Sequence, residues 1–93
     1  ARLFCLDDTT GKIIWHYTGA GGWTGSACTP ETVICGSSTD VFMSCLAADP
    51  HPDGTPKLLW RTRVNSIFHE SIPAIHGDRA FILCSDGYLY AFK

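Results

Sequence analysis

The sequence predicts an all-β fold built from short antiparallel strands. Short apolar runs recur along the chain, and Gly and Pro lie between them at intervals that suit turns. No window keeps apolar residues at helical spacing between plausible caps. We expect nine strands, at residues 2–7, 12–17, 25–29, 32–37, 41–47, 57–63, 70–75, 79–84 and 87–92.

The first predicted hairpin, Leu3–Trp15, has the clearest pattern. Its opening residues Leu-Phe-Cys-Leu are apolar at every position, which is typical of a strand buried on both faces. Asp7 can bond nearby backbone in the turn, and Gly11 can adopt positive φ. Two isoleucines and Trp15 then suit a second strand.

This unit recurs, which indicates a repeat. Trp15 and Trp60 lie 45 positions apart, and a serine follows each after eleven residues. Three further features follow in the same order in both copies. The first is an apolar strand, Val-Ile-Cys at 33–35 and Phe-Ile-Leu at 81–83, and the second is a turn with Ser and Asp. The third is a return of the opening motif, at 43–46 and 89–92. Four strands per repeat at this period are typical of a β-propeller blade.

The blade interpretation divides the chain into three parts. Residues 1–17 would end one blade, residues 25–63 would form a complete four-stranded blade, and residues 70–93 would begin the next. Because a propeller needs about 4–8 blades, we expect a fragment of a longer protein or a chain completed by copies of itself. The end strands Leu3–Leu6 and Leu89–Phe92 would then be open to self-assembly or to a protein partner.

The motif around the first turn resembles that of the PQQ-like repeat propellers. This family includes quinoprotein alcohol dehydrogenases and the outer-membrane assembly lipoprotein of the BAM complex, and its tryptophan-docking pattern is Ala-x-Asp-x-x-x-Gly-x-x-x-Trp. Here Cys5, Asp7, Gly11 and Trp15 stand in that register, with Cys in place of Ala.

The second copy of the pattern is less regular. It keeps Cys45, Gly54 and Trp60, has Ala47 where the aspartate belongs, and contains a longer turn. The third copy reaches Ala91. The resemblance implies structural docking roles for both tryptophans and for Asp7, Gly11 and Gly54, and it implies a periplasmic or other extracytoplasmic location.

Charge and hydropathy exclude two classes of partner. A net charge of −2 gives no electrostatic basis for binding nucleic acid. No apolar run approaches the roughly 20 residues that a membrane-spanning helix needs, so we expect no membrane span.

Three residues are candidates for contact with a ligand or partner. Trp23 lies in a glycine-rich connection that leads into a predicted innermost strand, near the expected mouth of a central channel. His69 and Ser71 would share one side of a strand, with Glu70 on the other. This alternation does not support a catalytic triad, and a polar lining of the channel entrance is the preferred interpretation.

The segment 49–56 has some features of a calcium loop. Asp49, Asp53 and the Thr55 carbonyl could supply oxygen ligands. However, His51 replaces an oxygen ligand and prolines interrupt the loop, so a rigid turn is preferred and no metal site is expected.

The five cysteines have irregular spacings without a Cys-x-x-Cys motif, which does not favour a zinc site. We interpret them as small buried hydrophobic residues. A disulfide between Cys28 and Cys35, which flank a predicted turn, stays open at this stage.

These observations favour a non-catalytic propeller module that acts as a scaffold or recognition domain and needs no cofactor. The alternative is a fragment of a PQQ-dependent quinoprotein dehydrogenase, which would require PQQ and calcium. The sequence contains no adjacent cysteine pair and no clear calcium cluster, which favours the first interpretation.

Overall fold

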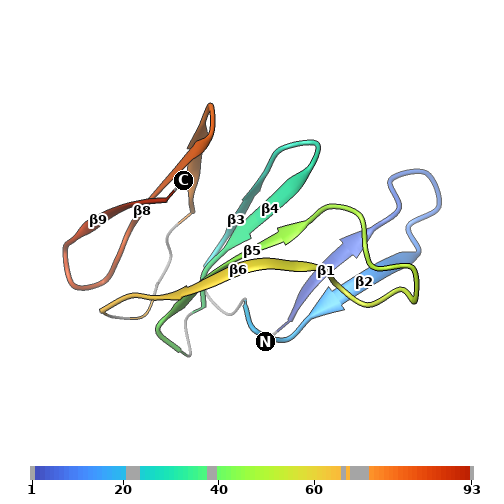
Figure 1. The fold of residues 1–93 in the computed structure, drawn as a ribbon, viewed down its shortest axis with the longest axis horizontal. Coiled ribbons are helices and arrows are strands. Elements are labelled where there is room, and N and C mark those ends of the chain that lie inside the picture. Colours follow the sequence, from blue (N-terminus) through green and yellow to red (C-terminus); the bar gives the residue numbers. More distant parts are fainter. Residues whose placement is uncertain (1, 21–23, 38–39, 66, 68–71, 93) are drawn as a thin grey trace.

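The computed structural model describes residues 2–20, 24–37, 40–65, 67 and 72–92. Within these residues the chain forms strands and turns and no helix (Figure 1). The strands are β1 (Leu3–Leu6), β2 (Ile13–Tyr17), β3 (Ser26–Cys28), β4 (Thr32–Cys35), β5 (Phe42–Ala47), β6 (Leu58–Arg63), β7 (Ala74–His76), β8 (Arg79–Leu83) and β9 (Leu89–Phe92).

The strands form three antiparallel sheets that follow chain order. The first sheet is β1-β2, the middle sheet is β3-β4-β5-β6 and the third sheet is β7-β8-β9. The predicted all-β class, and the predicted grouping into two, four and three strands, are therefore confirmed.

The seventh strand differs from its prediction of 70–75. It begins at Ala74 and ends at His76. Pro73, which has no backbone N–H to donate to a ladder, directly precedes it. Gly77, with φ of 61°, turns the chain back into β8. Residues 70 and 71 of the predicted strand lie outside the described residues.

The β1–β2 turn is built as its residues predict. The Asp7 carboxylate accepts hydrogen bonds from the backbone N–H groups of Thr9 and Thr10, at 2.8 and 2.9 Å. Gly11 adopts φ of 75° and donates its N–H to the Asp7 carbonyl. Positive φ disfavours residues with a Cβ, so this position favours glycine.

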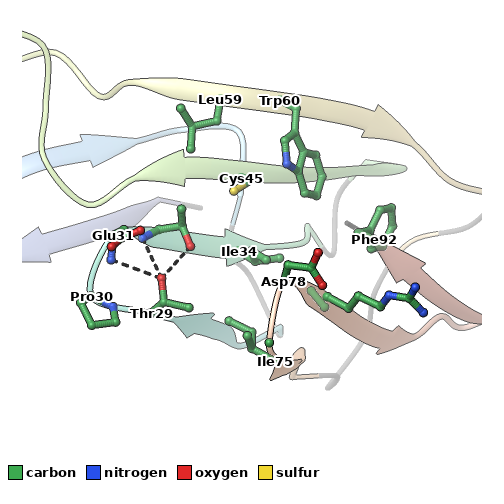
Figure 2. A pocket seen from close by; sticks show the side chains of 14 residues that line it. Thr29, Pro30, Glu31, Ile34, Cys45, Leu59, Trp60, Ile75, Asp78 and Phe92 are labelled. Carbon is green, nitrogen blue, oxygen red and sulfur yellow. Dashed lines mark hydrogen bonds between the residues drawn. The ribbon is translucent and has the colours of Figure 1, made fainter.

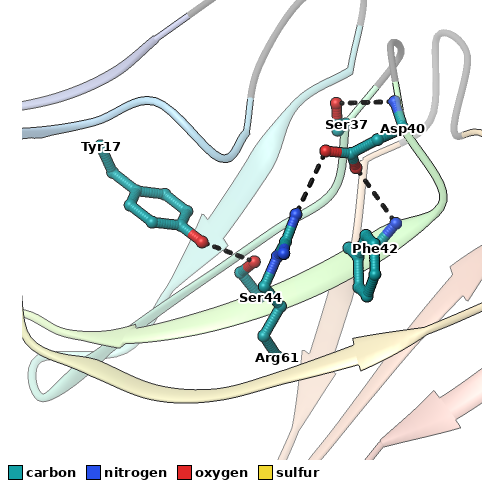
Figure 3. Close-up of polar contacts among 6 residues, drawn as sticks. All are labelled: Tyr17, Ser37, Asp40, Phe42, Ser44 and Arg61. Atoms are coloured by element: carbon teal, nitrogen blue, oxygen red, sulfur yellow. Dashed lines mark hydrogen bonds and ion pairs between the residues drawn. The ribbon is translucent and has the colours of Figure 1, made fainter.

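The first and middle sheets pack face to face. Trp15 is 3% exposed and belongs to a core cluster with Cys35 and Leu46 of the middle sheet. Its indole N–H donates to the Ala48 carbonyl at 2.9 Å. The Tyr17 hydroxyl lies 3.2 Å from Ser44 Oγ across the same interface (Figure 3). One aromatic strand of the first sheet therefore fixes it on the middle sheet.

The opposite face of the middle sheet packs on the third sheet. Ile34, Met43 and Cys45 form one core cluster with Ala80 and Ile82 of β8. At the end where β3 and β7 approach, a Cβ added to Gly25 would lie 2.5 Å from Ile72 Cγ1. The middle sheet is thus covered on both faces, which accounts for the four consecutive buried residues, 43–46, of β5. The expectation that Leu3–Leu6 is buried on both faces is wrong, because Phe4 and Leu6 face away from the middle sheet and are exposed.

The two hairpins that carry tryptophan share one register. Cys5 pairs with Trp15 and Cys45 pairs with Trp60, and in each ladder the register shifts directly after the cysteine. The same local irregularity therefore occurs twice, which strengthens the evidence for a repeat.

The strand ladders correct one detail of the repeat alignment. The sequence alignment matches Ile34 with Ile82. In the structure, however, Ile34 pairs with Cys45, and the residue that pairs with Ala91 is Phe81. Cys45 and Ala91 occupy the same repeat position, so their cross-strand partners Ile34 and Phe81 correspond to each other. The equivalent of Ile34 is therefore Phe81, one residue before the Ile82 of the sequence alignment.

Polar contacts hold the β4–β5 connection to the edge strand β6. The Asp40 carboxylate accepts a hydrogen bond from the Phe42 N–H at 3.1 Å and pairs with the Arg61 guanidinium at 3.2 Å (Figure 3). The guanidinium carbon lies 3.8 Å from the centre of the Phe42 ring. Both charged side chains are partly exposed, so this pair orders the turn and adds little stability.

The structure separates two tryptophans that the sequence treats as equivalent. Trp15→Ala removes a buried ring and leaves the Ala48 carbonyl without its donor, so we expect a loss of about 3–5 kcal/mol. Trp15→Phe should cost about 1 kcal/mol, which is typical of one hydrogen bond. Trp60→Ala should cost less than Trp15→Ala, because Trp60 is only half-buried. Urea unfolding followed by circular dichroism measures all three, and equal losses for the two alanine variants would contradict this ranking.

Candidate binding groove

A groove with a volume of about 510 Å³ lies between the middle and third sheets (Figure 2). Ile34, Cys45, Trp60, Ile75 and Phe92 supply its apolar lining. Two turns form its rims, residues 29–32 between β3 and β4 and residues 77–79 between β7 and β8. The volume falls within the range of small-molecule and side-chain pockets.

The first rim is held by one threonine. Thr29 Oγ1 accepts hydrogen bonds from the backbone N–H groups of Glu31 and Thr32, at 3.2 and 3.1 Å, as Figure 2 shows. The Ala48 N–H donates to the Glu31 carbonyl at 2.8 Å and ties this rim to the end of β5. The rim is therefore fixed by short-range bonds before any ligand arrives.

The second rim is the tight turn between β7 and β8. His76 pairs with Arg79, and Gly77 and Asp78 connect them. Asp78 and Arg79 are both exposed at the groove. With Glu31 on the facing rim, the entrance carries charges of both signs around an apolar interior.

Trp60 is the aromatic wall of the groove. Its ring lies 5.5 Å from the Phe92 ring at an interplanar angle of 23°, and the Phe92 ring lies 6.2 Å from that of Tyr90. Trp15 is covered at the corresponding position of the first interface, whereas Trp60 lines an open groove. The half-exposed indole and Phe92 together can pack against an apolar or aromatic group.

Cys45 does not add nucleophilic chemistry to the groove. Burial raises the pKa of its thiol above the ordinary value of 9.0, so the thiol stays protonated at neutral pH. Because the thiolate is the reactive form, Cys45 serves here as an apolar contact.

The predicted contact residues Trp23, His69 and Ser71 lie outside the described residues. Of the predicted docking residues, Asp7 and Gly11 form the β1–β2 turn, and Gly54 adopts φ of 87° in the turn between β5 and β6. Trp15 lies in the first interface and Trp60 in the second, so the structure places them on successive sheets.

The turn itself uses one of the acidic loop residues, Asp53. Asp53 Oδ1 accepts hydrogen bonds from the Thr55 hydroxyl at 2.6 Å and the Thr55 N–H at 3.0 Å, and these bonds lower the pKa of the Asp53 carboxyl. The Thr55 carbonyl accepts the His51 N–H. Among the described residues, which include Asp49, the His, Cys, Asp and Glu side chains form no group of three or more that could hold a metal ion.

Cys28 and Cys35 do not form the disulfide that the sequence leaves open. Cys28 pairs with Val33 across the hairpin and Cys35 pairs with Ser26, so the two cysteines are not opposite each other. Cys5, Cys28, Cys35 and Cys45 are free thiols. Burial, with a smaller contribution from Cys45, raises the pKa of Cys35 to about 12, and burial also raises the pKa of Cys5.

Sequence reasoning missed the groove. Its rims, at Thr29–Thr32 and Gly77–Arg79, lie more than forty residues apart in the chain. No local pattern marks them as neighbours. The one available signal was Trp60 itself, which the repeat predicts to face the following sheet.

Comparisons with protein-family models, with curated proteins and with solved structures found no match to this chain. Within the described part of the chain, no helix is long and apolar enough to cross a membrane.

We predict a sharp order of thiol reactivity. Cys28 is exposed, whereas Cys35, Cys45 and Cys84 are buried. Alkylation of the native chain near pH 8, read by mass spectrometry of the peptides, should modify Cys28 first and Cys35 last. The urea-unfolded chain should lose this order. Preferential labelling of Cys35 in the native chain would contradict the buried position.

The Asp7 turn predicts a pH dependence. Hydrogen bonds from two backbone N–H groups, with the larger effect from Thr10 and the smaller from Thr9, lower the pKa of the Asp7 carboxyl below its ordinary value of 3.8. The carboxylate therefore stabilises the fold above pH 3.8, and that contribution is lost as the pH falls through the lowered folded pKa. The carboxyl ¹³C shift of Asp7 should titrate at lower pH in the native chain than in the urea-unfolded chain. Equal midpoints would show that the turn does not favour the carboxylate.

Proposed function

We propose that this chain is a non-catalytic β-sheet repeat module of the propeller type, which acts as a scaffold or recognition domain. The observation that carries the proposal is the repeated interface. The Cys5–Trp15 face of the first sheet packs on the middle sheet, and the Cys45–Trp60 face of the middle sheet packs on the third. Successive sheets thus use equivalent surfaces, as the blades of a propeller do.

The grouping of strands supports the same proposal. In a blade of four strands, β1 and β2 correspond to the last two strands, because they share the register of β5 and β6. Strands β7 to β9 correspond to the first three, because their ladders follow those of β3 to β5. The resemblance to the PQQ-like repeats rests on the sequence positions Cys5, Asp7, Gly11 and Trp15.

The polar groups of the described residues favour a structural role. Asp7, Asp40 and Asp53 each accept bonds from their own turns. Asp86 likewise accepts the Tyr88 N–H at 3.0 Å. Carboxylates used in this way order loops and are not positioned toward a shared reaction centre.

The groove supports a recognition role. Its rims are ordered by internal bonds, and its wall is the half-exposed Trp60. Apolar interiors with a charged rim are typical of sites that bind one projecting side chain or a small ligand. Recognition at this groove would therefore require no catalytic group.

The discriminating experiment is a titration with PQQ and excess calcium, followed by tryptophan fluorescence. The scaffold proposal predicts no saturable quenching at micromolar PQQ. N-acetyltryptophanamide, titrated in parallel, corrects for absorption of light by the quinone. Quenching that saturates at a fixed stoichiometry, and only in the presence of calcium, would overturn the proposal and favour a quinoprotein dehydrogenase fragment.

A further inference from the structure

Both ends of the stack of sheets expose apolar faces. On the first sheet, Phe4 and Leu6 of β1 and Ile14 of β2 point away from the middle sheet and are exposed; we call this the first outer face. On the third sheet, the residues of β8 and β9 that alternate with the buried core positions are Arg79, Phe81, Leu83, Leu89 and Ala91, and the four apolar ones are here called the third outer face. His76 of β7 pairs with Arg79 at the edge of this face. Leu83 and Leu89 pair with each other and are both exposed.

Each outer face corresponds to a face that the middle sheet buries. Leu89 occupies the repeat position of Met43, yet Leu89 is 68% exposed and Met43 is fully buried. Leu6 occupies the position of Leu46, and their exposures are 54% and 0%. The difference lies in the neighbour: the middle sheet has a sheet on each side, and the end sheets have one.

We propose that the third outer face binds the first outer face of a second copy of this chain, so that copies stack head to tail. The proposal rests on the repeat architecture proposed above and adds the partner of its two ends. The face that contains Cys45 or its repeat equivalent is called the Cys45 type, and the opposite face, with Leu46 or its equivalent, is called the Leu46 type. At both interfaces within the chain, a face of the Cys45 type packs on a face of the Leu46 type. Stacking of copies continues that rule.

The two outer faces are complementary to each other and not to themselves. The third outer face is of the Cys45 type, since Ala91 and Phe81 stand where Cys45 and Ile34 stand. The first outer face is of the Leu46 type. Contact between two different surfaces is heterologous and generates rings or open chains of copies.

The chemistry of the faces favours this occupant. The four residues of the third outer face are apolar, and the exposed His76 and Arg79 continue the same face beside the β7–β8 turn. On the first outer face, His16 lies beside Phe4, with ring centres 6.0 Å apart, and it is the titratable residue among those that alternate outward on β1 and β2. Association therefore buries apolar area, and the long Arg79 side chain at the edge of the third outer face can keep its charge in water. One chain carries both complementary faces, so a second copy satisfies both.

Two charge substitutions test the stacking. Leu89→Glu blocks the third outer face and Leu6→Glu blocks the first, and both residues are exposed, so the fold should persist. In sedimentation velocity, the wild-type chain should gain mass with concentration, and each variant alone should remain monomeric. An equimolar mixture of the two variants should form a dimer of twice the monomer mass, because one intact face of each type remains.

Two controls locate the effect. Leu58→Glu places the same charge on an exposed leucine of the middle sheet and should assemble as the wild type does. The double variant Leu6→Glu/Leu89→Glu should stay monomeric in every mixture. Circular dichroism establishes that each variant is folded.

Three results would overturn the stacking. These are a folded wild-type chain that stays monomeric at high concentration, single variants that dimerise alone, and a mixture of variants that does not associate. Assembly of the double variant would assign association to the strand edges instead. None of these results bears on the scaffold proposal, which the quinone titration tests separately.

Discussion

The packing of Trp15 between two sheets is the interaction on which the arrangement depends most clearly. The first sheet has only two strands, and an isolated two-stranded hairpin is marginally stable in water. The indole supplies a large apolar area, and its N–H satisfies the Ala48 carbonyl just beyond β5. The same ring therefore buries the hairpin and orients it on the middle sheet.

The Ala48 carbonyl is available because other bonds fix its neighbourhood. The Ala47 N–H donates to the Lys57 backbone carbonyl across the β5–β6 connection, and the Ala48 N–H donates to the Glu31 backbone carbonyl. Glu31 in turn belongs to the rim that Thr29 holds. One short network of hydrogen bonds thus positions the Ala48 carbonyl for Trp15 at the first interface and holds Glu31 at the rim of the groove at the second.

Incomplete covering of one tryptophan gives the molecule its groove. Trp60 occupies the repeat position of Trp15, and its partner across the interface is Phe92 near the end of β9. An aromatic side chain that stabilises one interface therefore lines a surface cavity at the other.

The sequence by itself determined the strands, their grouping and the turns. Unbroken apolar runs and the recurrence of Trp15 at Trp60 carry that information, because ladder pairing and turn chemistry are local. Its errors were local too, since Pro73 shortened β7 and the pairing of Phe81 with Ala91 moved the repeat alignment by one residue.

Only the tertiary structure decided which faces are covered. Trp15 and Trp60 hold the same position in the repeat, but the first is buried and the second opens on a groove. Met43 and Leu89 likewise hold one repeat position with opposite exposure. The physical reason is that burial depends on the sheet that lies opposite, and residues distant in the chain, such as those of the two groove rims, supply that sheet.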